Sequence, residues 1–305
     1  MSSSPGPVPS RGVATLRTAA VAIAFALGAC SPAGERPGAV APEGPAEPGD
    51  GGGAAARYEN YVALGDSFAA LGPVAAPTTG PEHCQRSTRN YAGLLAERPG
   101  IGTLVDATCG SATIPDLTSP QSARTAPQFD ALTPEVDLVT LSIGGNDVGF
   151  GDMVECIVST PGADTGAPCR DRLELSVTAA LDGLGAQLDG VYAGIREHSP
   201  DARIVTTAYL PLVPADGGCD FVARMSPGDV TWTRHVTDRI NRIVVDAADR
   251  AGAVAVLPDD AQERSACAAP EARYTDFTGL ETGSHPMHPT AAGHRAMADA
   301  VSEAL

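Results

Sequence analysis

The 305-residue sequence contains no lysine: all 20 of its basic residues are arginine, against 37 acidic residues. The formal net charge is −17, which argues against nucleic acid as a partner because a phosphate backbone requires a basic surface. Aromatic residues are also scarce, at 4%, although 43% of the residues are hydrophobic. We therefore expect a core built from Ala, Val, Leu and Ile in a chain long enough for one large domain.

The N-terminal hydrophobic stretch, residues 19–30, is too short to span a bilayer comfortably. Because Arg11 and Arg17 precede it, the segment has the order of a secretory signal peptide. The stretch ends in L-G-A-C, which resembles a bacterial lipobox, whose cysteine becomes the lipidated first residue of the mature protein. We expect a signal peptide at residues 1–29 and a lipid on Cys30, with ordinary cleavage or a retained anchor as alternatives.

The next segment, residues 30–57, lacks large apolar residues and is rich in Pro, Gly and Ala. It cannot bury enough apolar surface to fold, which predicts a flexible tether. A lipid, a tether and then a domain at residues 58–305 predict a protein outside the cytoplasmic membrane, anchored to its outer face or secreted.

None of the cysteines forms a C-x-x-C pair, and none has metal-ligand spacing with the histidines. Six cysteines follow Cys30, and an exported protein is expected to hold them as three disulfides. Pairing neighbours in sequence order is one of several possible arrangements. It would give Cys84–Cys109, Cys156–Cys169 and Cys219–Cys267.

Strand-like and helix-like segments alternate from Tyr58 onward. Short β-branched runs predict strands at residues 60–66, 102–108, 135–147, 202–210 and 253–257. Longer amphipathic runs predict helices at residues 91–100, 175–198, 230–251 and from Pro289 to the C-terminus. The run at 135–147 is apolar on both sides, as in a central parallel strand. The alternation predicts a three-layer α/β/α sandwich around a mostly parallel sheet.

Three motifs fall at strand ends, where parallel α/β folds bind their ligands. The first is G-D-S at residues 65–67, which exposes the Ser67 hydroxyl on a turn before a helix. The second is G-G-N-D at residues 144–147, in which Asn146 offers an amide donor for an oxyanion. The third is HPMHPTAAGH at residues 285–294, which supplies an imidazole. Each motif alone also fits an ordinary turn.

In this order, G-D-S, G-G-N-D and H-P-x-x-x-G-H resemble the motifs of the SGNH (GDSL-type) hydrolases, over residues 58–305. The six cysteines further resemble the actinobacterial secreted lipase and esterase branch. The resemblance implies a flavodoxin-like fold and ester hydrolysis without a metal or an organic cofactor. Asp66 and Asp147 are expected to fix their turns, and Trp232 is expected in the core.

The resemblance implies that Ser67 is the nucleophile and His288 the base. The oxyanion would be held by the Ser67 backbone N–H and the Asn146 side chain. A further backbone N–H would come from Gly110 or Ser111, in the loop after the second strand, and the sequence leaves open which of the two donates.

The choice of His288 over His285 rests on spacing, because His288 has Gly293 and His294 five and six residues later. The family normally carries an aspartate three residues before the base, where this chain has His285. We expect the backbone carbonyl of His285 to hold the ring instead, which gives a Ser–His dyad. Glu281, in the same loop, is the alternative acceptor.

The leading functional prediction is an extracytoplasmic carboxylester hydrolase, an esterase or lipase, that acts on small ester or lipid substrates through an acyl-enzyme. One alternative is an O-deacetylase of polysaccharide or cell-wall sugars, which the scarcity of aromatic residues opposes because sugar grooves favour stacking. The other is a non-catalytic surface-binding lipoprotein, supported only by the missing aspartate. A monomer is expected.

Overall fold

The computed structural model describes residues 57–160, 162 and 165–305. The predicted signal peptide (1–29), the predicted lipidation site Cys30 and nearly all of the predicted tether (30–57) lie outside the described residues. Within the described part of the chain, no helix combines the length and the hydropathy needed to cross a membrane.

The core of the structure is a sheet of five parallel strands in the order β4-β1-β5-β6-β7. The strands are β1 (Tyr58–Gly65), β4 (Ile101–Asp106), β5 (Leu138–Ser142), β6 (Arg203–Thr207) and β7 (Val254–Val256). Chain order therefore reverses between β1 and its neighbour β5, and ligands of doubly wound sheets bind beyond such a switch point.

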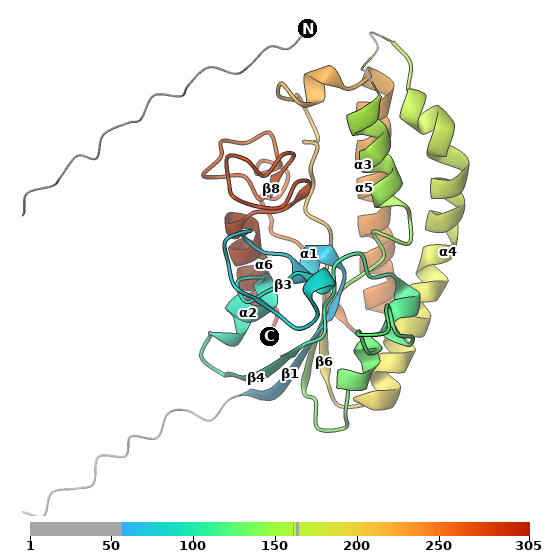
Figure 1. Cartoon of the computed structure of the whole chain (residues 1–305). Coiled ribbons are helices and arrows are strands. Elements are labelled where there is room, and N and C mark those ends of the chain that lie inside the picture. Colours follow the sequence, from blue (N-terminus) through green and yellow to red (C-terminus); the bar gives the residue numbers. More distant parts are fainter. Residues whose placement is uncertain (1–56, 161, 163–164) are drawn as a thin grey trace, which may run out of the picture. The chain divides into compact units, whose positions relative to one another are not determined.

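Helices cover both faces of the sheet, as Figure 1 shows. They are α1 (Ser67–Ala70), α2 (Tyr91–Ala96), α3 (Phe150–Ser159), α4 (Pro168–His198), α5 (Pro227–Arg250) and α6 (Ala291–Glu303). Alternate residues of β1 face opposite layers: Val62 and Leu64 pack in the cluster of α4 and α5, and Tyr61 and Ala63 pack in that of α2 and α6. The predicted three-layer α/β/α architecture is confirmed.

The remaining elements are short and lie in the connections. They are β2 (Thr78–Thr79), β3 (Arg86–Ser87), β8 (Thr275–Asp276), β9 (His288–Pro289) and the 3₁₀ turns η1 (Glu82–Cys84), η2 (Ile114–Leu117), η3 (Gln128–Ala131) and η4 (Val222–Arg224).

The structure differs from the sequence-based prediction at three helices. Helix α4 begins at Pro168 and not at residue 175. Helix α3 was not predicted, because glycines at its start and a length of 10 residues leave little periodic signal. Pro289 does not open α6 but ends β9, and Thr290 is the N-cap, with its side chain accepting from the Gly293 N–H. Trp232 lies in the core, 4% exposed, as expected.

Three disulfides join the six cysteines in sequence order. They are Cys84–Cys109, Cys156–Cys169 and Cys219–Cys267. The first ties η1 to the loop after β4, the second ties α3 to α4, and the third ties the segment before η4 to the loop after β7.

Candidate active site

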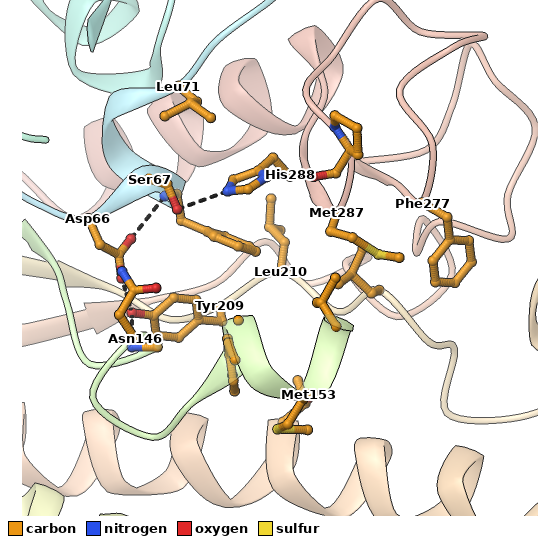
Figure 2. A pocket seen from close by; sticks show the side chains of 18 of the residues that line it. Asp66, Ser67, Leu71, Asn146, Met153, Tyr209, Leu210, Phe277, Met287 and His288 are labelled. Atoms are coloured by element: carbon orange, nitrogen blue, oxygen red, sulfur yellow. Dashed lines mark hydrogen bonds between the residues drawn. The ribbon is translucent and has the colours of Figure 1, made fainter. Parts of the chain in front are cut away.

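The three motif segments meet at the carboxyl ends of β1 and β5, at the switch point of the sheet. Ser67 begins α1, Asn146 lies in the loop after β5, and His288 comes from β9 just before α6. Figure 2 shows the three side chains around one cavity.

The G-D-S turn depends on Gly65. Its φ is +145°, and a Cβ at this position would lie 2.3 Å from the carbonyl oxygen of Ser142, so only glycine fits. The buried amide of Gln128 bonds both sides of Gly65, accepting from its N–H at 2.7 Å and donating to its oxygen at 2.9 Å. Asp66 caps α1 as expected, accepting from the Phe68 N–H.

His288 is in hydrogen-bond contact with Ser67. Its Nε2 lies 2.8 Å from Ser67 Oγ, and its Nδ1 lies 2.7 Å from the carbonyl oxygen of Pro286. Because a carbonyl only accepts, Nδ1 carries the ring proton, and Nε2 is left to accept from the serine hydroxyl. Burial lowers the pKa of His288, partly opposed by the bond to Pro286, which favours the neutral ring at pH 7.

The prediction that the His285 carbonyl holds the ring is wrong by one residue. That carbonyl accepts from the backbone N–H of His288 at 3.3 Å, which closes a turn. Met287 in this turn has a φ of +62°, a left-handed conformation that side chains other than glycine rarely adopt. With the His285 carbonyl occupied by the backbone, the neighbouring Pro286 carbonyl bonds the ring instead.

Glu281, the alternative acceptor, has a different partner. Its carboxylate pairs with Arg273 at 2.9 Å, and its side chain is 62% exposed. The ring of His285 lies with its centroid 6.4 Å from that of His288. No carboxylate hydrogen bond to His288 is present among the described residues.

The predicted oxyanion donors Asn146 and Gly110 or Ser111 lie on two loops that are bonded to each other. Asn146 Nδ2 donates to the carbonyl oxygen of Ala112 at 2.8 Å, which leaves its second amide hydrogen free. The Gly110 N–H already donates to the Cys84 carbonyl at 2.9 Å, whereas the Ser111 N–H has no partner among the described residues. Of the two candidates that the sequence left open, the geometry favours Ser111.

Tyr209 belongs to this site although the sequence did not single it out. Its hydroxyl donates to Asp66 Oδ2 at 2.6 Å and accepts from the Gly145 N–H at 2.7 Å, so it joins two of the motif loops. Burial raises the pKa of Asp66 to about 7, and hydrogen bonds from Tyr209 and Phe68 oppose the rise. The one signal in the sequence that could have drawn attention to Tyr209 is its place at the carboxyl end of the predicted strand at residues 202–210.

Asp147 fixes more than its own turn. Its carboxylate accepts from the N–H of Ile114 at 3.0 Å and 3.2 Å, and therefore links the G-G-N-D loop to the loop that holds Ser111.

His83, for which no site role was predicted, bonds Thr125 through Nε2 at 2.7 Å and lines the cavity.

A cluster near this loop has the residue types of a metal site. The side chains of His83, Cys84 and Cys109 lie within 4.8 Å of one another. Both sulfurs are joined in a disulfide, however, so the cluster offers no thiolate for a metal.

The cavity beside Ser67 and His288 has a volume of about 400 Å³. Helices α1, α3 and α5, the loop that holds Ser111 and the segments after β6 and before β9 all contribute to its walls. Figure 2 shows part of this lining. Most of the lining side chains are apolar: Phe68, Leu71, Phe150, Met153, Val154, Ile157, Leu210, Leu212, Val213, Phe221, Met225, Phe277 and Met287. Such a cavity suits an apolar group attached to the atom that the serine attacks.

Known proteins share both this sequence pattern and this fold. The sequence model of the GDSL-like Lipase/Acylhydrolase family matches residues 63–296. The chain belongs to this family. Lipase 2 of Streptomyces coelicolor is 34% identical over 253 residues, which cover 81% of this chain and 85% of that protein. The chain is therefore an ester hydrolase of the lipase and esterase type.

Two solved structures of this hydrolase type are similar. An extracellular lipase from Streptomyces rimosus has a TM-score of 0.67 and 26% identity, over 81% of this chain and 100% of that one. Phospholipase A1 from Streptomyces albidoflavus NA297 has a TM-score of 0.62 and 26% identity, over 81% and 99%.

Tyr209→Phe in this GDSL-family hydrolase is expected to lower kcat about 10-fold with little change in KM. The change removes the donor to Asp66 and the acceptor for Gly145, so the two loops lose their fixed spacing. Kinetics on a short p-nitrophenyl ester, alongside thermal unfolding, would measure it.

Tyr192→Phe is the matched control. The Tyr192 hydroxyl is also buried and lies 2.7 Å from the Thr206 hydroxyl, but Tyr192 does not line the cavity. It should cost similar stability and leave kcat within about 2-fold. Equal kcat losses in the two variants would show that Tyr209 acts only on the stability of the fold.

Proposed function

We propose that this hydrolase cleaves carboxylic esters with a Ser67–His288 dyad, through an acyl-enzyme on Ser67. The observation that carries the proposal is the 2.8 Å contact between Ser67 Oγ and His288 Nε2, in a ring whose other nitrogen bonds Pro286. The Pro286 carbonyl fixes the tautomer and orientation of the ring, the role that an aspartate has in a triad. The missing aspartate therefore gives no support to a purely binding role.

In the first half-reaction, His288 Nε2 accepts the hydroxyl proton while Ser67 Oγ attacks the ester carbonyl carbon. The carbonyl oxygen becomes an oxyanion, held by the backbone N–H groups of Ser67 and Ser111 and by Asn146 Nδ2. The tetrahedral intermediate collapses as His288 returns the proton to the leaving alcohol. The acyl group then remains on Ser67.

In the second half-reaction, a water molecule takes the place of the alcohol. His288 accepts its proton, the hydroxide attacks the acyl carbonyl, and the same donors hold the second oxyanion. Collapse of this intermediate releases the carboxylic acid and returns the proton to Ser67.

The substrate is an ester with an apolar acyl chain. A cavity of about 400 Å³ lined mostly by apolar side chains has room for far more than an acetyl group. This favours an esterase or lipase over the O-deacetylase alternative. The names of the relatives, which include lipases and a phospholipase, agree with this choice.

We place the enzyme outside the cytoplasmic membrane. Three disulfides are typical of proteins that fold in an oxidising compartment, and the similar Streptomyces rimosus lipase is extracellular. Lipidation of Cys30 and a monomeric state stay predictions from the sequence.

The proposal is tested by assaying the exported protein on p-nitrophenyl esters from acetyl to palmitoyl. Ser67→Ala and His288→Asn should each lower kcat by about 10³-fold or more, because the nucleophile and the base act as a unit. A fluorophosphonate probe should label the unmodified protein at Ser67. His285→Asn is the matched control and should retain activity, and ester hydrolysis that survives Ser67→Ala would refute the mechanism.

Activity is expected to fall on the acid side with a midpoint below 6.5. Only neutral His288 can accept the serine proton, and burial lowers the pKa of His288 from its usual 6.5. The rate is therefore lost only when the pH falls through that lowered value. The measurement is kcat/KM against pH on a short ester. A midpoint near 7 would assign the limb to Asp66, whose pKa is about 7, and contradict this expectation.

Ile157→Trp should narrow the cavity and change the chain-length preference. Ile157 lines the cavity from α3, so a larger side chain there occupies space otherwise open to the acyl group. We expect kcat/KM to fall about 10-fold or more on a palmitoyl ester and to stay within about 2-fold on acetate. Val158→Trp is the control, since Val158 is 64% exposed on the same helix. An equal fall on both esters would place the acyl chain elsewhere.

A further inference from the structure

The loop that carries Ser111 is a tight turn. The N–H of Ala112 donates to the carbonyl of Cys109 at 3.2 Å, which closes a four-residue turn with Gly110 and Ser111 at its centre. Ser111 has a φ of +62°, and Gly110 is not among the residues with positive φ. This combination is that of a type II turn, in which glycine is the usual residue at the position that Ser111 holds.

The turn type decides where the Ser111 N–H points. Type I and type II turns differ mainly by a flip of the central peptide, here the peptide between Gly110 and Ser111. No described peptide bond is cis, so the Gly110 carbonyl and the Ser111 N–H point in opposite directions. A type I turn would relieve the positive φ of Ser111 but would turn its N–H away from its present direction. The preference of serine for a negative φ therefore favours the type I turn over the type II turn seen in the structure.

The side chain of Gln121 bonds the peptide between Gly110 and Ser111. Its Nε2 donates to the carbonyl oxygen of Gly110 at 2.8 Å, on the side of the peptide opposite the Ser111 N–H. Its own Oε1 is buried and has no hydrogen-bond partner among the described residues. A buried amide oxygen left without a partner costs stability, so this glutamine is poorly explained as a device for stability alone.

The other bonds that hold this loop do not fix the orientation of the peptide between Gly110 and Ser111. The disulfide of Cys109 to Cys84 holds the first residue of the turn, and the bond from the Arg86 side chain to the carbonyl of Thr108 holds the residue before it. Among the described residues, the bond from Gln121 is the one side-chain bond to the Gly110 carbonyl, which a peptide flip would carry to the other side.

We propose that Gln121 is a positioning residue of the oxyanion hole: by bonding the Gly110 carbonyl it holds the turn in its type II form and directs the Ser111 N–H at the substrate oxyanion. The inference rests on the proposed function, in which Ser111 is a backbone donor. It assigns a catalytic effect to a side chain that does not itself line the cavity.

The test uses Gln121→Leu and Gln121→Met, whose side chains are of similar size but have no donor for the Gly110 carbonyl. Loss of one oxyanion donor costs about 10²- to 10³-fold in kcat, so a donor held only part of the time should cost about 10- to 100-fold. KM on a short p-nitrophenyl ester should stay within about 3-fold, because the substrate carbonyl carries little charge before attack. The inhibition constant of octyl trifluoromethyl ketone, whose adduct with serine carries an oxyanion, should rise by the same factor as kcat falls.

Ser111→Gly added to Gln121→Leu should recover most of the lost kcat, because glycine adopts the positive φ without strain. Gln262→Leu is the matched control: like Gln121, Gln262 is half-buried with a buried, unpartnered Oε1 and does not line the cavity, but no hydrogen bond joins it to the turn at Ser111 among the described residues. It should leave kcat and ketone binding unchanged.

The proposal is overturned if Gln121→Leu leaves ketone binding unchanged, or if the glycine substitution recovers nothing. It is also overturned if thermal unfolding and ketone binding change alike in the Gln121 and Gln262 variants. Failure of the proposed function is a separate result, because it would appear as hydrolysis that survives Ser67→Ala in the chain with Gln121 intact.

Discussion

The close approach of β1 and β5 at their carboxyl ends is the constraint on which the active site depends. The two strands remain paired as far as Gly65 and Ser142, and the Asp66 N–H still donates to the Ser142 carbonyl at 2.8 Å. No side chain fits at Gly65 under this carbonyl. The serine and the asparagine loop therefore leave the sheet from adjacent points, and the short loops that follow can hold a catalytic geometry without long, mobile connections.

The loops that follow β1 and β5 begin side by side, and a few hydrogen bonds between loops then fix the positions of the site residues. Tyr209 joins the serine turn to the asparagine loop, Asp147 joins the asparagine loop to η2, and Asn146 bonds the turn at Ser111 through Ala112. Donors fixed in this way stabilise a developing oxyanion without reorganising during the reaction. In the proposed dyad this matters more than it would in a triad, because the neutral Pro286 carbonyl orients the histidine but adds no negative charge beside the imidazolium.

The sequence was sufficient for the architecture and for naming residues that the structure brings together at the strand ends. Two-sided apolarity identified β5, and the spacing to Gly293 and His294 singled out His288 from its neighbour. The acceptor for its ring was missed because it depends on a left-handed Met287, which no residue pattern signals. Tyr209 was missed because its two partners lie 143 and 64 residues away in the chain, a contact that only the folded sheet creates.

Two of the disulfides, Cys84–Cys109 and Cys156–Cys169, each hold a segment that lines the cavity. Cys109 is the first residue of the turn that carries Ser111, and Cys156 directly precedes Ile157 in the cavity wall. The proposed oxyanion hole and the apolar cavity are thus each held by a disulfide, a bond that forms under oxidising conditions. A newly made chain in a reducing cytoplasm lacks both disulfides, so we expect it to hydrolyse esters poorly until these bonds have formed.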